Sequence, residues 1–487
     1  MRAKLRIGDI PRANAAVALG VVGISLAWLA QPLRGGDTGP LMAGTETLGD
    51  CLARLDLFLC AQTTPIGPWP VLQYVPDLIA HAAGASIDGR VRVLAILSGL
   101  GVAGAVAAAW VALRRLGVPE WRWAFLLVVA AGPALAYGSS TWGEMLGAGL
   151  LTVFVAAALL RVAPFLVGLA AFGAGLTKET GYPFVIALGL VALLLARQRA
   201  RAPIRPQVIA VLVGVAAAVA ASGALNLIRF GTPRNAYYLD PGLRTTTAGH
   251  FFELMAGLVV APNGGIVFFW PSAFILVALL VGLPLAAALR GTMAWRDAWA
   301  AVALLAVVGG LLAGLASWWA PFGWWAWGPR LSLPWVFSLL LLALAAFGER
   351  LTPVAARVLA SAAGFAGVAV LVVLAALPHV GFLWHPETVG DFFFVSQTAV
   401  CPGGGPPPTP EYYACLHEEM WTRPPIWLDA LAGLRRLEGV ATLAAVVLVA
   451  VGSLAALRRE VIAKAAEHAA SAPSVEERAD VVPDVST

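Results

Sequence analysis

Charged residues are scarce in this chain. Asp, Glu, Lys and Arg together make up 12% of the 487 residues, whereas hydrophobic residues make up 60%. Soluble domains typically contain about 25% charged residues. The mean hydropathy of +0.82 and the long uncharged blocks exclude a water-soluble globular protein. We predict an all-α integral membrane protein, because a helix satisfies every backbone polar group within its own segment.

Nucleotide-binding and metal-binding motifs are also missing. The sequence contains neither GxxxxGK[ST] nor a GxGxxG step between a strand and a helix, the glycine-rich loops that hold phosphates. We therefore expect no ATP or nucleotide-sugar partner. The six histidines are scattered, and no His/Asp cluster has ligand spacing, so we expect no metal ion and no other cofactor.

Only four cysteines are present, and they fall in two segments. Cys51 and Cys60 lie in the first long polar loop, and Cys401 and Cys415 lie in the last one. Cysteines confined to such loops indicate disulfides on the oxidising side of a membrane. Three pairings are possible, and the two short-range ones are favoured because each closes a small loop. Free thiols are the alternative.

The apolar residues that dominate the chain form about twelve runs of roughly 15 to 25 residues, each bounded by charged or turn residues. Each run is long enough to be a candidate span, although the two at 163–176 and 182–196 are short and could be one broken pair. The runs lie near 13–30, 91–113, 122–138, 143–161, 163–176, 182–196, 207–228, 265–289, 298–317, 331–347, 354–377 and 438–457.

Basic residues predict the sidedness of these spans, because cytoplasmic loops carry the excess of Lys and Arg. Alternation from a cytoplasmic N-terminus places Arg114, Arg115, Arg197, Arg458 and Arg459 inside, without a misfit. The net charge of +5 is therefore a topology signal and gives no support to nucleic-acid binding. The composition has three lysines against 29 arginines, which is typical of a GC-rich bacterial genome. We expect a bacterial plasma-membrane protein with both termini in the cytoplasm.

The polar mass is distributed unevenly along the chain. Residues 1–457 form the expected transmembrane domain, in which the first outer loop (31–90) and the last outer loop (378–437) each have about 60 residues. Loops of that length without regular structure are uncommon unless they are functional. The segment 458–487 is rich in Ala, Glu and Val and predicts a disordered cytoplasmic tail.

Three charged residues stand at the expected outer edge of the membrane. Asp37 follows the first span, Glu144 lies in a turn between two spans, and Lys178 precedes a Glu-Thr-Gly step. Charges so close to hydrocarbon are costly unless they are solvated or paired, so they are candidates for function. The ordinary alternatives are an N-cap or turn aspartate, a glutamate favoured by a helix dipole, and a snorkelling lysine paired with its neighbouring glutamate.

Arginines add positive charge to the same edge. Arg229 and Arg234 flank a Phe-Gly-Thr-Pro step, and Arg330 ends the segment Gly-Trp-Trp-Ala-Trp-Gly-Pro-Arg. Two acids and several bases on one side of a membrane suit a reaction that deprotonates a hydroxyl and releases an anionic phosphate. Trp327 and Trp142 are candidates for stacking on a sugar ring, although most of the 18 tryptophans suit an interfacial belt.

The order of these motifs resembles a known family. A first outer loop containing Gly-Asp-Thr and Leu-Asp-Leu-Phe precedes Lys-Glu-Thr-Gly, Arg-Phe-Gly-Thr-Pro, Pro-Asn-Gly-Gly and finally Trp-Gly-Pro-Arg. This order, over roughly residues 13 to 350, resembles bacterial polytopic glycosyltransferases of the GT-C superfamily, relatives of the protein O-mannosyltransferases and the aminoarabinose transferases. The last outer loop, 378–437, shows no such resemblance.

The resemblance implies a bundle of about twelve helices with extended extracytoplasmic loops. It implies transfer of one sugar, usually with inversion, from a polyprenyl-phosphate donor in the membrane lipid to an extracytoplasmic acceptor. Asp37 matches the general base of that family, and Glu144 matches the acid that positions the acceptor or assists the base. Lys178 and Arg330 match the cations that hold the donor phosphate. This sequence departs from the family where Thr-Trp-Gly precedes Glu144, because Tyr or His is often found there.

Two other classes stay open. A secondary transporter or lipid-linked-sugar flippase also fits twelve spans with both ends inside, but such proteins usually show two related halves and broken helices at the midplane. A surface-polysaccharide polymerase or ligase also acts on polyprenyl-linked substrates, but would carry its large basic loop near the middle of the chain. The aspartate in the first long loop favours the glycosyltransferase.

Overall fold

The structure is a computed structural model of the chain. It describes residues 9–35, 38–55, 70–200, 203–235, 242, 244–323, 328–384, 401, 408–422 and 431–471. In these ranges all regular secondary structure is helical, apart from two isolated bridges that join Leu33 to Ser140 and Arg244 to Trp318. The all-α prediction is confirmed for the part of the chain that the structure describes.

The α-helices follow the apolar runs of the sequence. Their bounds are α1 Asp9–Ala30, α2 Thr38–Arg54, α4 Val71–Ala82, α5 Ile87–Arg115, α6 Trp121–Ala130, α7 Ala134–Tyr137, α8 Glu144–Leu159, α9 Pro164–Gly175, α10 Tyr182–Ala200, α11 Arg205–Phe230, α13 Ala248–Val260, α14 Ile266–Phe269, α15 Pro271–Leu289, α16 Trp295–Ala316, α17 Leu333–Ala360, α18 Ala362–Trp384, α20 Pro410–Trp421 and α22 Leu437–Ser471. Short 3₁₀ turns, η1 Glu179–Gly181 and η3 Arg330–Ser332, directly precede α10 and α17.

Nine helices within the described ranges are long and apolar enough to cross a membrane. The protein is therefore a multi-pass membrane protein. The sequence predicted about twelve spans, and the three runs that differ are 122–138, 143–161 and 163–176. These form shorter helices: α6 with the single turn α7, then α8 and α9 with 16 and 12 residues. Gly132 and Pro133 interrupt the first of these runs.

Helix α17 forms the centre of the bundle. Within its most apolar 18-residue window 78% of the residues are buried, against 17% for α1 at the periphery. It contacts α8, α10, α15, α16, α18 and α22. A helix that is buried on all sides has apolar residues on every face, and the Leu-rich stretch 339–344 fits this pattern. Because α17 is held from every side, its first turn is a rigid base for Arg330.

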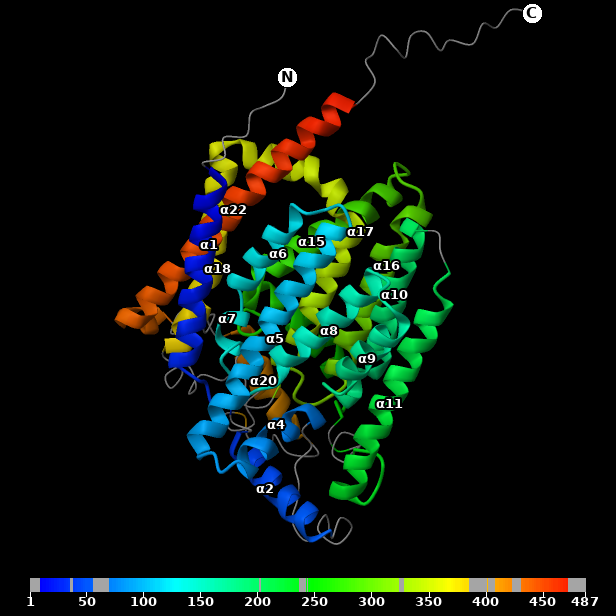
Figure 1. Cartoon of the computed structure of the whole chain (residues 1–487), viewed down its shortest axis with the longest axis vertical. Coiled ribbons are helices and arrows are strands. Elements are labelled where there is room, and N and C mark those ends of the chain that lie inside the picture. The colour runs from blue at the N-terminus through cyan, green and yellow to red at the C-terminus, as the bar shows by residue number, and fades with distance from the viewer. Residues whose placement is uncertain are drawn as a thin grey trace, which may run out of the picture.

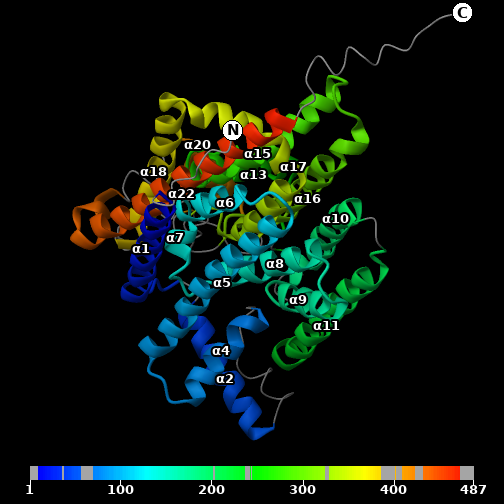
Figure 2. The same cartoon turned by 45° about the horizontal axis from the view of Figure 1, so that its top comes forward.

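The two ends of the bundle differ (Figure 1). Helices α2 and α4 lie at one end, whereas the start of α1 and the end of α22 lie at the opposite end. Figure 2 shows the same separation of α2 and α4 from the main bundle. The first segment predicted as an outer loop therefore lies at one end, and the described termini share the other. Which end faces the cytoplasm stays a prediction.

Two boundaries correct the sequence prediction. Helix α18 continues to Trp384, past the expected start of the last outer loop at 378, and buries His379, whose Nε2 bonds to the Phe269 carbonyl at 2.9 Å. Helix α22 continues to Ser471, whereas a disordered tail was expected from 458. The extension is rich in Ala, Glu, Lys and Arg, which are strong helix formers. Its Glu460 pairs with Arg122 at 2.9 Å.

A buried ion pair holds the first outer segment together. Asp77 on α4 accepts two hydrogen bonds of 2.7 Å from the Arg90 guanidinium on α5, and both side chains are almost fully buried. Arg90 also pairs with Glu46 on α2 and donates to the Met42 carbonyl at 3.1 Å. One guanidinium therefore connects α2, α4 and α5 by charge-assisted bonds.

The last outer segment contains a disulfide. Cys401 and Cys415 are bonded, with Cα atoms 5.5 Å apart, which is one of the two short-range pairings predicted. Cys51 is also disulfide-bonded, whereas Cys60 lies outside the described residues.

Candidate functional site

The turn before α8 is tied to the segment that follows the first span. Leu33 donates to the Ser139 carbonyl at 2.8 Å, and its own carbonyl accepts from the Thr141 amide at 3.0 Å. The Thr141 hydroxyl accepts from the Gly35 amide at 2.9 Å and shares a 2.6 Å hydrogen bond with Thr38. These bonds place Glu144, the first residue of α8, beside the beginning of the first outer loop.

Close helix packing fixes the position of α8. Helices α5 and α8 approach so closely that a Cβ on Gly101 would stand 2.2 Å from the Met145 carbonyl oxygen, and one on Gly149 would stand 2.3 Å from the Gly101 oxygen. Small residues allow backbones to approach in this way in membranes, where packing drives helix association. Any side chain at either position would displace the helix that carries Glu144.

Glu144, Lys178 and Arg330 converge at this end of the bundle. Arg330 Nε lies 3.3 Å from Glu144 Oε1, and both side chains are largely buried. Lys178 lies near enough that Glu144 and Arg330 are the two charges that act on its ammonium. Glu144 begins α8, Arg330 begins the 3₁₀ turn η3 before α17, and Lys178 directly precedes the 3₁₀ turn η1 before α10. These three described side chains, two cations and one carboxylate, together carry a net positive charge.

The protonation of Lys178 is sensitive to this environment. Loss of hydration by burial lowers the pKa of Lys178 to about 8, with Glu144 opposing the shift and Arg330 adding to it. Its side chain is half-buried in the structure. An additional anion in the cluster would favour the ammonium form, so the site is suited to bind a negatively charged group.

Arg330 is held from two further sides. Its guanidinium lies 5.3 Å from the centre of the Trp142 ring, a cation–π geometry. On the other side is Gly323, with φ of 103°, where a Cβ would stand 2.9 Å from Arg330 Nε. A side chain at residue 323 would be strained and would push Arg330 away from Glu144.

Unpaired polar atoms lie beside the cluster. Within the described ranges, Glu144 Oε2, Trp142 Nε1 and Gln73 Oε1 are buried and make no hydrogen bond within the protein. The Gln73 amide lies over Gly143, because a Cβ there would meet its nitrogen at 2.2 Å. Buried polar groups normally have partners, so these three are positioned to accept or donate bonds to a polar ligand. The sequence did not indicate Gln73, which lies 71 positions from Glu144 and has no motif around it.

The two other predicted arginines, Arg229 and Arg234, lie apart from this cluster. Arg229 is buried and pairs with Glu179 at 2.7 Å, while its Nε donates to Asn226 at 2.8 Å. Arg234 is exposed and lines a cavity of about 280 Å³ next to Glu179 and Asn226. Neither arginine is brought to the cluster of Glu144, Lys178 and Arg330. The cation of Arg229 is already compensated by a carboxylate.

Besides Cys60, two predicted residues lie outside the described ranges: Asp37 and Trp327. The neighbours of Asp37 are informative, because Gly35 and Thr38 both contact Thr141, three residues before Glu144. Trp142 is buried, and its ring contacts Arg330 and Tyr137. Stacking of Trp142 or Trp327 on a sugar stays a prediction. Among the described side chains, no group of three or more His, Cys, Asp or Glu residues could hold a metal ion.

The fold and the cluster define a polytopic α-helical membrane protein with a net cationic site at one end of its bundle. Over 93% of its length this chain is similar to the crystal structure of ArnT from Cupriavidus metallidurans in the apo state, with 17% identity, a TM-score of 0.45 and 78% of that chain covered. It is similar over 94% of its length to ArnT from the same organism bound to undecaprenyl phosphate, with 17% identity, a TM-score of 0.42 and 78% of that chain covered.

No protein-family model matches the sequence, and no curated protein matches it significantly. Structural likenesses of this size support no inference about activity. The function is therefore inferred from the side chains of the cluster.

Proposed function

We propose that the protein is an integral membrane glycosyltransferase that moves one sugar from a polyprenyl-phosphate donor to a hydroxyl acceptor outside the cytoplasm. The observation that carries the proposal is the convergence of Glu144, Lys178 and Arg330, which are distant in sequence, at the membrane edge of one end of the bundle. A net positive, partly dehydrated site at that depth suits a lipid-linked phosphate, since charge-assisted contacts are stronger there than in water.

The donor side of the reaction requires stabilisation of a leaving phosphate. As the bond between the sugar C1 and the phosphate oxygen breaks, negative charge grows on that oxygen. Lys178 and Arg330 are positioned to neutralise it, and cations that are already in place lower the barrier because they need no reorganisation. The lipid phosphate then leaves by diffusion in the bilayer.

The acceptor side requires a base and a means of orienting the hydroxyl. Asp37 takes the acceptor proton as the hydroxyl oxygen attacks C1 from the face opposite the phosphate, which inverts the configuration. Glu144 uses Oε1 toward Arg330 and offers Oε2 to the acceptor. Gln73 and the Trp142 indole N–H supply further hydrogen bonds. A hydroxyl-rich acceptor matches this set of donors and acceptors.

The test is sugar transfer by purified protein in lipid, with a panel of radiolabelled polyprenyl-phosphate sugars and an extract of cell-envelope acceptors. The variants are Asp37→Asn, Glu144→Gln and Arg330→Ala, compared at equal folded yield. Arg92→Ala is the matched control, because Arg92 is an exposed arginine on α5 at the same end of the bundle. We expect one donor to be consumed, with losses of about 10²-fold or more for the three variants and none for the control.

Two outcomes would contradict parts of the proposal. If Asp37→Asn transfers sugar as fast as the wild type while Glu144→Gln does not, the base is Glu144. If no donor is consumed by wild-type protein that binds polyprenyl phosphate, the cluster is a binding site without transfer. The secondary transporter or flippase would then be tested by transbilayer movement of the same labelled lipid, and polymerase or ligase activity by lengthening of a diphosphate-linked glycan.

A further inference from the structure

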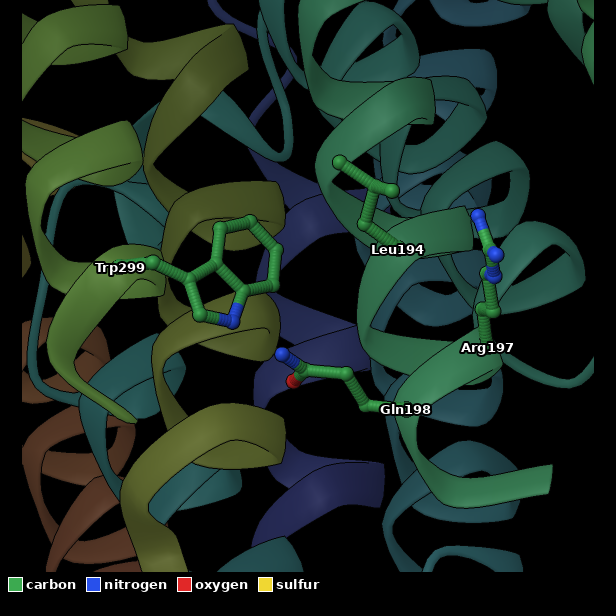
Figure 3. A pocket seen from close by; sticks show the side chains of 4 residues that line it. All are labelled: Leu194, Arg197, Gln198 and Trp299. Atoms are coloured by element: carbon green, nitrogen blue, oxygen red, sulfur yellow. The ribbon is translucent and has the colours of Figure 1, made fainter. Parts of the chain in front are cut away.

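A second polar cavity lies between α10 and α16. Its volume is about 490 Å³, and it is lined by Leu194, Arg197 and Gln198 of α10 and by Trp299 of α16. Figure 3 shows Gln198 and Trp299 on facing helices, with the two side chains pointing toward each other across the gap. The cavity is open to the outside of the bundle, because Leu194, Arg197 and Gln198 are exposed and Trp299 is half-buried.

This cavity is distinct from the cluster around Lys178. Lys178 precedes the first turn of α10, whereas Arg197 and Gln198 lie in its last turn. A helix of 19 residues is about 28 Å long, close to the thickness of the hydrocarbon layer. The two sites therefore face opposite surfaces of the membrane.

The polar groups of the cavity favour an anion. The Arg197 guanidinium, the Gln198 amide and the Trp299 indole all carry N–H donors, and the arginine and the indole offer no acceptor. Among the described residues, Arg197 forms no ion pair with a carboxylate. Its neighbour Arg199 is used differently, since it donates to the Leu116 and Ala345 carbonyls.

The apolar surroundings favour a lipid over a free ion. Leu194 and Leu190, one helical turn apart on α10, are 39% and 37% exposed, and they lead from Arg197 toward the middle of the span. Val302 and Leu305 on α16 are 46% and 50% exposed. A phosphate bound at Arg197 would thus have an acyl-chain path beside it, and Trp299 lies near the beginning of α16, a candidate span, where indoles would meet the interface that they prefer.

We propose that this cavity binds the phosphate headgroup of an anionic glycerophospholipid, on the membrane surface opposite the Glu144, Lys178 and Arg330 cluster. Arg197 holds the phosphate, Gln198 and the Trp299 indole N–H bond to the polar headgroup, and Leu190 and Leu194 contact an acyl chain. The site is independent of the proposed transfer reaction.

The test is native mass spectrometry of the full chain in detergent, titrated with phosphatidylglycerol or with phosphatidylcholine of the same acyl chains. We expect tighter binding of phosphatidylglycerol. Arg197→Gln weakens it about fivefold, and Trp299→Phe weakens it while keeping the ring. Arg357→Gln is the control, because Arg357 is an exposed arginine in the last turn of α17, at the same membrane surface; it leaves the binding unchanged. Circular dichroism checks that every variant is folded.

Further measurements distinguish lipid binding at Arg197 from lipid binding at the Lys178 cluster and from binding of free phosphate. Arg330→Ala keeps the phosphatidylglycerol preference if the lipid binds at Arg197, and loses it if the lipid binds at the Lys178 cluster. Displacement by millimolar inorganic phosphate would show a free-anion site and overturn the lipid proposal. Equal binding of the two lipids, or equal losses for Arg197→Gln and Arg357→Gln, would also overturn it.

Discussion

We expect the charge on Lys178 to control how tightly the proposed site binds its donor. Because burial lowers the pKa of Lys178 to about 8, the ammonium is present below that pH and is lost above it. We expect kcat/KM for the donor to be level below pH 8 and to fall about tenfold per pH unit above it. Bound phosphate favours the ammonium form of Lys178. The pH profile of kcat, unlike that of kcat/KM, therefore begins to fall at a higher pH.

The matched variant for this profile is Lys178→Arg. An arginine stays charged throughout the range, so the break near pH 8 disappears even if the rate is lower. A break that persists unchanged in Lys178→Arg would assign it to another group.

Trp142 positions Arg330 through its ring. We expect Trp142→Phe, which keeps an aromatic face, to raise KM for the donor only slightly. Trp142→Leu removes the cation–π contact of 5.3 Å and raises KM about 2- to 30-fold. Thermal unfolding in the same detergent separates this effect from general instability. If Phe and Leu raise KM equally at equal folded yield, the ring does not orient Arg330.

The convergence of these residues could not be deduced from their local sequence. Glu144 is also an ordinary first-turn glutamate, and Lys178 also suits a snorkelling role beside Glu179. Only tertiary packing brings Glu144 and Lys178 to Arg330. The same packing pairs Glu179 with Arg229 instead of Lys178. The motif order pointed to three charges that the structure brings together, but it could not tell that Arg229 was compensated.

At the scale of helices, the Arg90 ion pair is expected to be the main tie of the outer segment. Arg90→Ala leaves Asp77 buried without its partner, which typically costs about 3–5 kcal/mol. Arg92→Ala, which removes an exposed side chain two residues later, is expected to change stability by less than about 0.5 kcal/mol. Thermal unfolding followed by transfer assays measures both. Equal melting temperatures for the two variants would contradict the assignment.

The helices themselves were largely predictable, because a run of apolar residues has only one stable form in a bilayer. The residues at which the helices begin and end were less predictable. The runs at 143–161 and 163–176 were predicted as spans, and their helices α8 and α9 have only 16 and 12 residues, because composition does not show where a helix ends. The extension of α22 was read as disordered because its contacts, Glu460 with Arg122 and Lys464 with Glu120 at 3.0 Å, come from distant residues.

At the scale of the whole molecule, the two ends of the helix bundle differ. The distribution of basic residues predicts which end is cytoplasmic. Helices α2 and α4 lie at one end, where Thr38 of α2 bonds to Thr141 near Glu144, and the end of α22 lies at the other. Reversal of the protein in the membrane would place the proposed site in the cytoplasm, where a different donor would be available. Sidedness is therefore as important for the function as the cluster.

Cysteine labelling tests the sidedness directly. Ala83 follows α4, Ala294 precedes α16, and both are exposed at opposite ends of the bundle. With a membrane-impermeant maleimide on intact cells, we expect Ala83→Cys to be labelled and Ala294→Cys to be labelled only after the membrane is permeabilised. The wild-type chain is the background control, since Cys51, Cys401 and Cys415 are disulfide-bonded. The opposite pattern would place Glu144, Lys178 and Arg330 in the cytoplasm, and a polyprenyl-phosphate sugar on the outer leaflet could not then reach them.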